Sequence, residues 1–179
     1  MELYGRADSA VLEKWAYSFP PAGVTLCRLE TGERVFETSL VAAGMEQCPE
    51  RALRLKRRFR AAYLAAGKAA LAYENTSDAV VFSPLRWGQI ADYDAAVYLF
   101  KSFLRLLHPG LRLPRPAVCI RMQEQTTQVE RIALIDAGMQ AGAGDVFLYR
   151  SSLSELREFA SQKKELRHSF AIHIETREK

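Results

Sequence analysis

Residues 117–149 constrain the fold of this chain more than any other stretch of the sequence. Residues 117–122 and 146–149 are short, apolar and bounded by turn-forming residues, which is the pattern of buried β-strands. Residues 126–142 between them carry apolar side chains at the spacing of an amphipathic helix. Parallel strands need a crossover connection, so the order strand, helix, strand predicts a βαβ unit. We therefore expect an α/β fold in which at least these two strands are parallel.

Further elements are predicted on both sides of this unit. We expect strands over residues 24–29, 34–42, 79–83 and 169–176, and helices over residues 8–19, 50–73, 95–107 and 153–164. The first two strands are predicted to form a hairpin, because a tight turn with a glycine separates them. Residues 84–92 are typical of a turn that leads into a short strand. We expect Asp92 or Asp94 to cap the helix that follows.

Two expectations concern the C-terminal part of the chain. The last helix presents Leu153, Leu156 and Phe159 on one side, so we expect these three side chains to face the core. Residues 169–176 alternate between apolar residues and a mixed set, which favours a strand near an end of the sheet.

Composition limits the classes of protein to which the chain can belong. Its 179 residues are 49% hydrophobic, which is enough for one domain with its own core. The formal net charge of +4 allows contact with an anionic membrane surface or with nucleic acid but requires neither. The sequence shows no signal-peptide pattern, and no run approaches the roughly 18 apolar residues of a membrane span. We expect a cytoplasmic protein.

Cysteine, histidine and paired carboxylates give no indication of a metal site. Cys27, Cys48 and Cys119 are not spaced as CxxC pairs, and the three histidines are scattered. We expect the cysteines to be buried, reduced thiols. Asp92 and Asp94 lack a third acidic partner, so a two-metal nuclease site is not indicated either.

Several stretches resemble the rod-shape-determining, actin-like family of bacterial MreB and its paralogues. The segment that follows residue 83 is similar to the family's "RPLxxGVIADFD", with matches at Pro84, Leu85, Gly88, Ile90, Ala91, Asp92 and Asp94. The helix after it, with Leu99, Phe100, Phe103 and His108, is similar to the family's next helix. Residues 127–131 resemble "TEVERR", and residues 141–148 resemble "AGAREVYL".

The resemblance implies an actin-like ATPase domain with a ribonuclease H-like fold. Such a domain has a mixed central sheet flanked by helices and a small inserted lobe. The resemblance further implies that residues 1–179 form a single actin-like first domain, with the smaller lobe at about residues 44–78. Full-length members have a second large domain, and the nucleotide is bound in the cleft between the two.

The same resemblance implies where ATP and Mg²⁺ would contact the chain. The family's first phosphate loop is of the "DxGT" type, and its nearest counterpart here is residues 28–32. Arg28 replaces the aspartate, Glu30 replaces a glycine, and Thr31 follows. The aspartate orients metal-bound water and the glycine lets backbone amides approach phosphate, so both functions are lost at this loop.

The second phosphate loop and the catalytic carboxylates depart from the family pattern in the same way. The family's "DIGGGT" has its nearest counterpart in His173, Glu175 and Thr176, where no glycine is present. Arg150 stands where the family has one of two glutamates that position attacking water. Glu30 and Glu175 would also repel a triphosphate. We therefore expect no ATPase activity and no cofactor, with an anion contact through Arg28 and Arg150 as the alternative to exposed or ion-paired arginines.

Residues 51–60 form a basic run on one of the predicted helices. Its arginines cover more than half of the helix, and they include Arg51, Arg54, Arg57 and Arg58. We consider three interpretations: a solvated helix face, contact with an anionic membrane, and contact with an acidic protein partner. Aromatic residues are not interleaved with the charges, so we expect no nucleic-acid binding.

These observations predict a non-catalytic, MreB-like protein that is linked to cell shape and the bacterial cytoskeleton and acts through protein–protein contacts. The expected partner is a full-length actin-like relative or a second copy of this chain, with peripheral contact at the inner face of the membrane. The alternative is a nucleotide-binding, actin-like ATPase that is completed by a second chain or by oligomerisation. This step from fold to role is an analogy.

Overall fold

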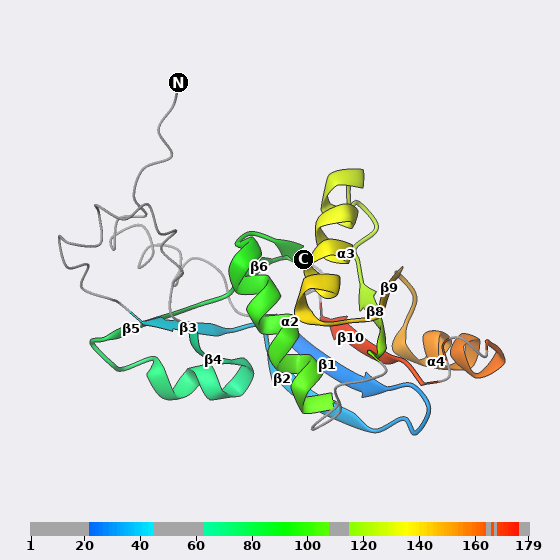
Figure 1. Cartoon of the computed structure of the whole chain (residues 1–179), viewed down its shortest axis with the longest axis horizontal. Helices are drawn as coiled ribbons and strands as arrows, with labels where there is room; N and C mark the ends of the chain where they lie inside the picture. Colours follow the sequence, from blue (N-terminus) through cyan, green and yellow to red (C-terminus); the bar gives the residue numbers. More distant parts are fainter. Residues whose placement is uncertain (1–21, 45–62, 108–114, 164–165, 167, 176–179) are drawn as a thin grey trace.

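The computed structural model describes residues 22–44, 63–107, 115–163, 166 and 168–175 (Figure 1). The predicted helix over residues 8–19 lies outside the described residues, as does the first part of the helix predicted over residues 50–73. Cys48 and Thr176 lie outside them as well.

A mixed five-stranded sheet is the centre of the fold. Its order is β2-β1-β10-β8-β9, and β1 is antiparallel to both β2 and β10, whereas β10, β8 and β9 are parallel to one another. The strands are β1 (Gly23–Arg28), β2 (Arg34–Thr38), β8 (Ala117–Arg121), β9 (Asp145–Tyr149) and β10 (Phe170–Ile174). The predicted hairpin and the parallel βαβ unit are both confirmed.

Strand β10 lies in the middle of this sheet, so the expectation of a strand near the sheet end is wrong. Phe170, Ile172 and Ile174 are buried in the larger core, which explains the apolar half of the alternation. The other half also faces protein, because Ala171 is buried in a second core and the His173 ring is hydrogen-bonded to Tyr149. The alternation of apolar and mixed residues therefore reflects a central strand whose two faces are both covered by protein.

Helices cover the two faces of the sheet unequally. Helices α2 (Tyr93–Leu107) and α3 (Gln128–Ala141) pack on one face, and α4 (Leu153–Gln162) packs on the other (Figure 1). Helix α2 contributes the largest part of the main core through Leu99, Phe100 and Phe103, all fully buried. Asp92 caps this helix, since its Oδ1 accepts a hydrogen bond of 3.0 Å from the backbone N–H of Ala95.

Both remaining helices begin with a capping box. Thr127 Oγ1 accepts from the backbone N–H of Glu130, and the Glu130 carboxylate accepts from the backbone N–H of Thr127. Ser152 and Glu155 form the same reciprocal pair at the start of α4. These local signals explain why the sequence predicts both helix starts to within two residues.

A second, three-stranded sheet has the order β4-β3-β5 and lies beside the first (Figure 1). It consists of β3 (Val41–Gly44), β4 (Tyr63–Ala66) and β5 (Ala79–Phe82), with the 3-10 helix η2 (Gly67–Tyr73) against it. The predicted helix 50–73 is therefore wrong over residues 63–66, which form β4, and residues 67–73 form a 3-10 helix instead of an α-helix. Gly67 has φ +65°, which ends any α-helix at that point, and the backbone of β4 instead pairs with β3.

The chain passes from one sheet to the other at Ser39. The predicted strand over residues 34–42 is divided there into β2 and β3. The Ser39 hydroxyl accepts from the backbone N–H of Ala22 at 2.9 Å and lies 2.8 Å from the Ser83 hydroxyl. Ser39 is fully buried, so these two hydrogen bonds satisfy a polar group at the junction of the sheets.

Two smaller predictions differ from the structure. Residues 84–92 form a tight hairpin of β6 (Leu85–Arg86) and β7 (Gln89–Ile90), where a turn and one strand were expected. Trp87 and Gly88 form its tip at positive φ. Phe159 is 53% exposed rather than inward, and the Lys163 ammonium lies 5.8 Å from its ring centroid.

Replacing one phenylalanine on each of two helices tests this division into core and surface. Phe100→Ala removes a fully buried side chain and should lower the free energy of unfolding by about 3–5 kcal/mol. Phe159→Ala is the matched control and should cost less than about 1 kcal/mol, because that ring is already half in water. Urea unfolding measures both; equal losses would contradict the assignment of Phe159 to the surface.

Candidate functional site

The residues predicted to contact nucleotide lie at opposite ends of the strands of the large sheet. Arg28 is paired with Phe170 at the start of β10, and Val24 is paired with Ile174 at its end. The turn that carries Glu30 and Thr31 therefore lies beside the start of β10, and His173 and Glu175 lie toward its end. The length of β10 separates the two groups by roughly 14 Å.

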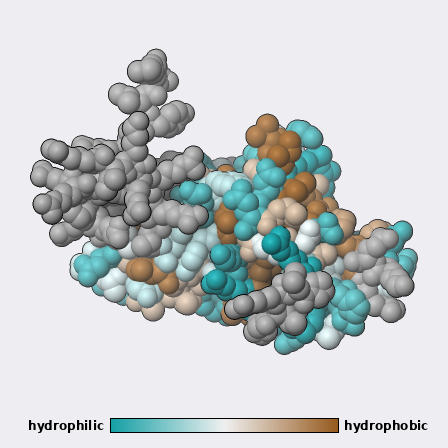
Figure 2. Space-filling view, in the orientation of Figure 1, coloured by the Kyte–Doolittle hydropathy of each residue, from teal (hydrophilic) through white to brown (hydrophobic). Residues whose placement is uncertain are grey.

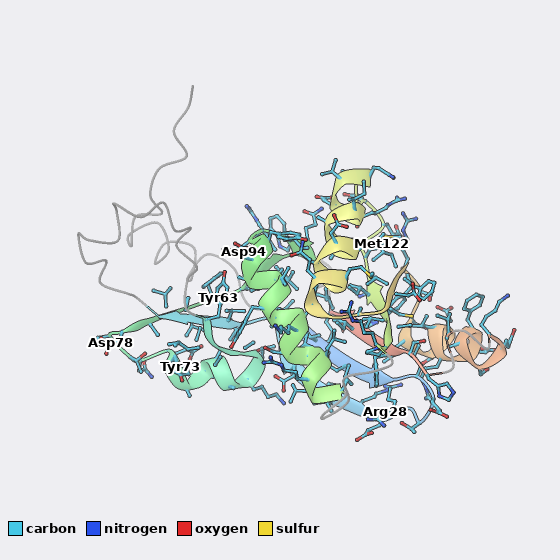
Figure 3. All side chains as sticks on the ribbon, in the orientation of Figure 1. Arg28, Tyr63, Tyr73, Asp78, Asp94 and Met122 are labelled. Atoms are coloured by element: carbon cyan, nitrogen blue, oxygen red, sulfur yellow. The ribbon has the colours of Figure 1, made fainter. Side chains whose placement is uncertain are left out.

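Arg150 belongs to the second group. It follows β9, which is parallel to β8 and β10, so it lies at the carboxyl edge of these three strands. Figure 3 shows the separation through two labelled residues, with Arg28 at the lower end of the sheet and Met122, which follows β8, at the upper end. The fold thus places Arg150, His173 and Glu175 at one end of the strands. It places Arg28, Glu30 and Thr31 at the opposite end.

The first group is held by contacts within the protein. The Arg28 guanidinium donates to the carbonyl of Leu107 at 2.9 Å and lies 3.8 Å from the Glu33 carboxylate. It also lies 5.6 Å from the ring centroid of Phe170. The Glu30 carboxylate is 2.9 Å from Nδ1 of His168. Of the two alternatives for Arg28, these contacts favour an arginine that is ion-paired within the protein.

His173 and Glu175 of the second group belong to a polar cluster on the sheet face that α4 partly covers. The Tyr149 hydroxyl lies 2.8 Å from His173 Nδ1, and the Thr25 hydroxyl donates to Glu175 at 3.1 Å. Arg121 Nη1 donates to the carbonyl of Ile174 at 3.1 Å. Thr25, Arg121 and Tyr149 were not predicted as site residues, because only the strand register shows that they share a face with His173.

Burial sets the protonation of this cluster. Burial is the main cause that lowers the pKa of His173, and the positive charge of Arg121 lowers it further, while Glu175 acts in the opposite direction. Burial likewise raises the pKa of Tyr149. At neutral pH both groups are therefore uncharged, and their hydrogen bond joins β9 to β10 without an ionised partner.

The described residues contain no group of three or more histidine, cysteine or acidic side chains that could hold a metal ion. Cys27 and Cys119 are buried and free, as the sequence predicts. Burial raises the pKa of the Cys119 thiol to about 12, and it raises that of Cys27 as well. Neither sulfur is a thiolate ligand or nucleophile at neutral pH.

The outer face of α3 carries more exposed large hydrophobic side chains than any other element in the described part of the chain. Four large aliphatic side chains on this helix are strongly exposed: Val129 at 76%, Ile132 at 50%, Ile135 at 37% and Met139 at 41%. We call these four residues the α3 stripe. Asp136 is the one charged residue among the exposed positions of the helix. Figure 2 shows apolar residues gathered over α3.

Small residues on the inner side of α3 explain why the large ones point outward. Gly138 and Ala137 face the sheet, and a Cβ added at Gly138 would lie 2.8 Å from Val146 and 3.2 Å from Ile120. The helix therefore lies too close to the sheet for a large side chain at that point. An exposed aliphatic stripe of this kind is typical of a protein contact surface.

Two further predictions concern membranes. Arg51, Arg54, Arg57 and Arg58 lie outside the described residues. Among the helices that the structure describes, none has the length and apolar character needed to span a bilayer.

Comparisons with known sequences identify relatives of this chain. A family model described as MreB/Mbl protein matches residues 52–154, which is more than half of the chain. The cell shape-determining protein MreB of Haemophilus influenzae is 30% identical over 76 residues, which make up 42% of this chain and 22% of that protein.

Solved structures of actin-like proteins share the fold. MreB5 of Spiroplasma citri bound to ADP has a TM-score of 0.55 and 24% identity over 72% of this chain and 35% of that chain. The same protein bound to AMPPNP has a TM-score of 0.54 and 25% identity over the same shares. The MamK double helical filament has a TM-score of 0.50 and 14% identity over 67% of this chain and 35% of that chain. The expected actin-like fold is confirmed, and the chain spans about a third of the length of these structures.

Replacing His173 by asparagine should flatten the pH dependence of stability. The folded chain holds the pKa of His173 below its ordinary 6.5, so the unfolded chain binds the proton more tightly. The free energy of unfolding therefore falls as the pH drops through 6.5 toward the folded value, and His173→Asn removes this loss. Urea unfolding between about pH 7.5 and about pH 5.5 measures the slope. An unchanged slope in His173→Asn would contradict the prediction.

Proposed function

Because this chain belongs to the MreB/Mbl family of actin-like proteins, we propose that it acts in bacterial cell-shape and cytoskeleton organisation by protein–protein contact, without hydrolysing ATP. We further propose that residues 1–179 are a single actin-like first domain, with the smaller lobe at about residues 44–78. Strand β4 and the 3-10 helix η2 lie within these bounds and support a separate lobe, and β3 and β5 of the same small sheet extend it to residues 41–44 and 79–82.

The α3 stripe is the observation that carries the proposal. Four aliphatic side chains in a row are exposed on one helix, while the inner side of the same helix packs on the sheet. Transfer of such side chains from water into an interface is favourable by roughly 25 cal/mol per Å² of apolar area. A single charge, Asp136, interrupts this face, so a partner with an equally apolar helix fits it better than a charged one.

The proposed partner is a second actin-like chain. A second copy of this chain brings the same stripe to the contact, and the stripe is nearly symmetric about residue 134, with Val129 and Met139 at equal distances from it. Two antiparallel copies of α3 then place Val129 of each copy opposite Met139 of the other, which is the arrangement of a two-fold contact. A full-length relative that presents a similar apolar helix is the alternative partner. The arginines of residues 51–58 add a peripheral contact with the anionic inner face of the membrane.

The proposal of a non-catalytic role is supported by the positions of the predicted phosphate-contact residues. They are divided between two edges of the sheet, and Arg28 and Glu30 are engaged with Leu107 and His168. The competing function is nucleotide binding by a chain that needs a second chain to complete its site. One observation favours it: MreB5 of Spiroplasma citri, 25% identical to this chain, has a structure bound to AMPPNP.

A charge placed in the α3 stripe should break the contact without unfolding the chain. Ile132→Glu leaves a half-exposed side chain in water in the monomer but buries a carboxylate in the assembly. We expect self-association to weaken at least about tenfold, measured by sedimentation velocity over a concentration series. Leu106→Glu, at an equally exposed leucine on α2, is the control and should associate like the wild type.

Two results would contradict the α3 contact. One is identical association of Ile132→Glu and wild type. The other is a wild-type chain that stays monomeric and also fails to sediment with a full-length MreB.

Calorimetry with ATP and Mg²⁺ separates the two functions. We expect no binding tighter than on the order of 1 mM to the isolated chain and no phosphate release above buffer. The same titration in the presence of the full-length relative tests for a site completed by a second chain. Micromolar binding by the isolated chain would overturn the non-catalytic proposal and leave the α3 contact to be judged by sedimentation alone.

A further inference from the structure

Strand β2 is one edge of the large sheet, and in the described part of the chain no strand is paired with its outer side (Figure 1). Its first three residues, Arg34, Val35 and Phe36, are exposed, whereas Glu37 and Thr38 are half-buried. The Phe36 side chain is 58% exposed. An edge strand with an exposed apolar centre is open to pairing with another strand.

The hydrogen bonds of the hairpin show which backbone groups of β2 point outward. The backbone N–H of Arg28 donates to the carbonyl of Glu33 at 2.9 Å, where the hairpin closes. In an antiparallel ladder, residues bonded in this way alternate with residues whose N–H and C=O point away from the partner strand. Val35 and Glu37 are two and four positions from Glu33, so they bond to β1. The residues of β2 with outward N–H and C=O groups are Arg34, Phe36 and Thr38.

The 3-10 helix η2 contacts β2 without covering its first three residues. The Glu37 carboxylate accepts a hydrogen bond of 2.7 Å from the backbone N–H of Lys68. Glu37 alternates with Phe36 along the strand, so its side chain lies on the face of the sheet that α2 covers. A Cβ built on Gly67 would lie 3.6 Å from Phe103 of α2, which places the start of η2 on that face as well.

Strand β2 lacks the features that protect sheet edges from pairing. Such edges commonly carry a proline, a lysine or a β-bulge. Residues 34–38 contain neither proline nor lysine, and their register with β1 is continuous. Val35 and Phe36 belong to the residue types that favour strands. In strand addition the backbone supplies most of the affinity, so this edge is suited to a second strand.

We propose that β2 pairs in antiparallel orientation with β2 of a second copy of this chain. Two identical edges related by a two-fold axis pair in this way when residues with outward N–H and C=O groups lie opposite each other. A register centred on Phe36 meets this condition and places the Phe36 rings of the two copies side by side. Arg34 then lies opposite Thr38, and Val35 lies opposite Glu37, so no like charges are paired.

The charge pattern favours this register over its neighbour. A register centred on Val35 also satisfies the backbone, but it places Glu33 of one copy opposite Glu37 of the other. Like charges directly opposite each other destabilise a strand pair. The segment is therefore complementary to itself in one register, and this supports a second copy as the occupant of the edge.

The β2 contact uses a different surface from the α3 stripe and does not depend on it. Helix α3 lies over β8 and β9, because a Cβ built on Gly138 would contact Ile120 and Val146. Strand β9 is the edge of the sheet opposite β2. A copy that uses both contacts is therefore joined to two neighbours.

Amide hydrogen exchange of the full chain, followed by NMR, tests the pairing. The Ile132→Glu chain is the starting protein, because its α3 stripe carries a charge. Contacts smaller than about 1,000 Å² are weak or transient, so exchange is compared at about 20 μM and about 1 mM protein. The N–H of Val35, bonded to β1, should be protected at both concentrations. The N–H of Phe36 should exchange at least about fivefold more slowly at the higher concentration only.

Two variants in the Ile132→Glu chain remove the pairing by different means. Phe36→Lys places two lysines opposite each other and should abolish the concentration dependence. Arg34→Pro removes an outward N–H at the first residue of an edge strand, where proline is tolerated and the bonds to β1 remain. It should weaken association at least about tenfold. Phe159→Lys, at a phenylalanine that is 53% exposed on α4, is the matched control and should pair like the starting protein.

The outcomes decide between the two contacts. Exchange of the Phe36 N–H at one rate at both concentrations overturns the β2 contact, as does slowing that persists in Phe36→Lys and Arg34→Pro. Association of the wild type that is lost in Ile132→Glu and unchanged in Phe36→Lys alone overturns the β2 contact and supports the α3 contact. The opposite pattern supports the β2 contact and contradicts the α3 contact.

Discussion

The backbone hydrogen bonds of β10 hold the two halves of the large sheet together. The β1–β2 hairpin lies on one side of this strand and the βαβ unit of β8, α3 and β9 on the other, and β10 is paired with both. Its apolar side chains complete the core beneath α2 and α3, and Ala171 completes the smaller core beneath α4. The spatial separation of the predicted phosphate-contact residues also follows from this pairing, because the antiparallel register places the β1 turn beside the start of β10.

Local signals in the sequence predicted the parts of the fold that depend on neighbouring residues. The βαβ unit and the cap at Asp92 follow from periodicity and side-chain chemistry within a few positions. The failures depend on contacts with distant residues. Residues 63–66 have helical spacing but pair with β3, and the alternation of β10 looked like an edge strand because the sequence does not show that His173 meets Tyr149.

The candidate surfaces were predictable to different degrees. The resemblance named residues in two loops, but their positions relative to each other depend on strand register, which the sequence alone did not give. The sequence predicted α3 but not its orientation. The close approach of Gly138 to Val146 decides that the small residues face the sheet and that the aliphatic ones face water.

The central place of β10 also affects how the chain reaches its native state. Thr25 and Glu175, which share a hydrogen bond, are 150 residues apart in the sequence. Contacts of such separation are formed late and slowly, because a long loop must close first. During translation the β1–β2 hairpin emerges long before its neighbour in the sheet, so the edge of β1 remains unpaired for most of synthesis. A nascent chain of this design is exposed to mispairing and aggregation, and chaperone dependence in the cell is the expected biological consequence.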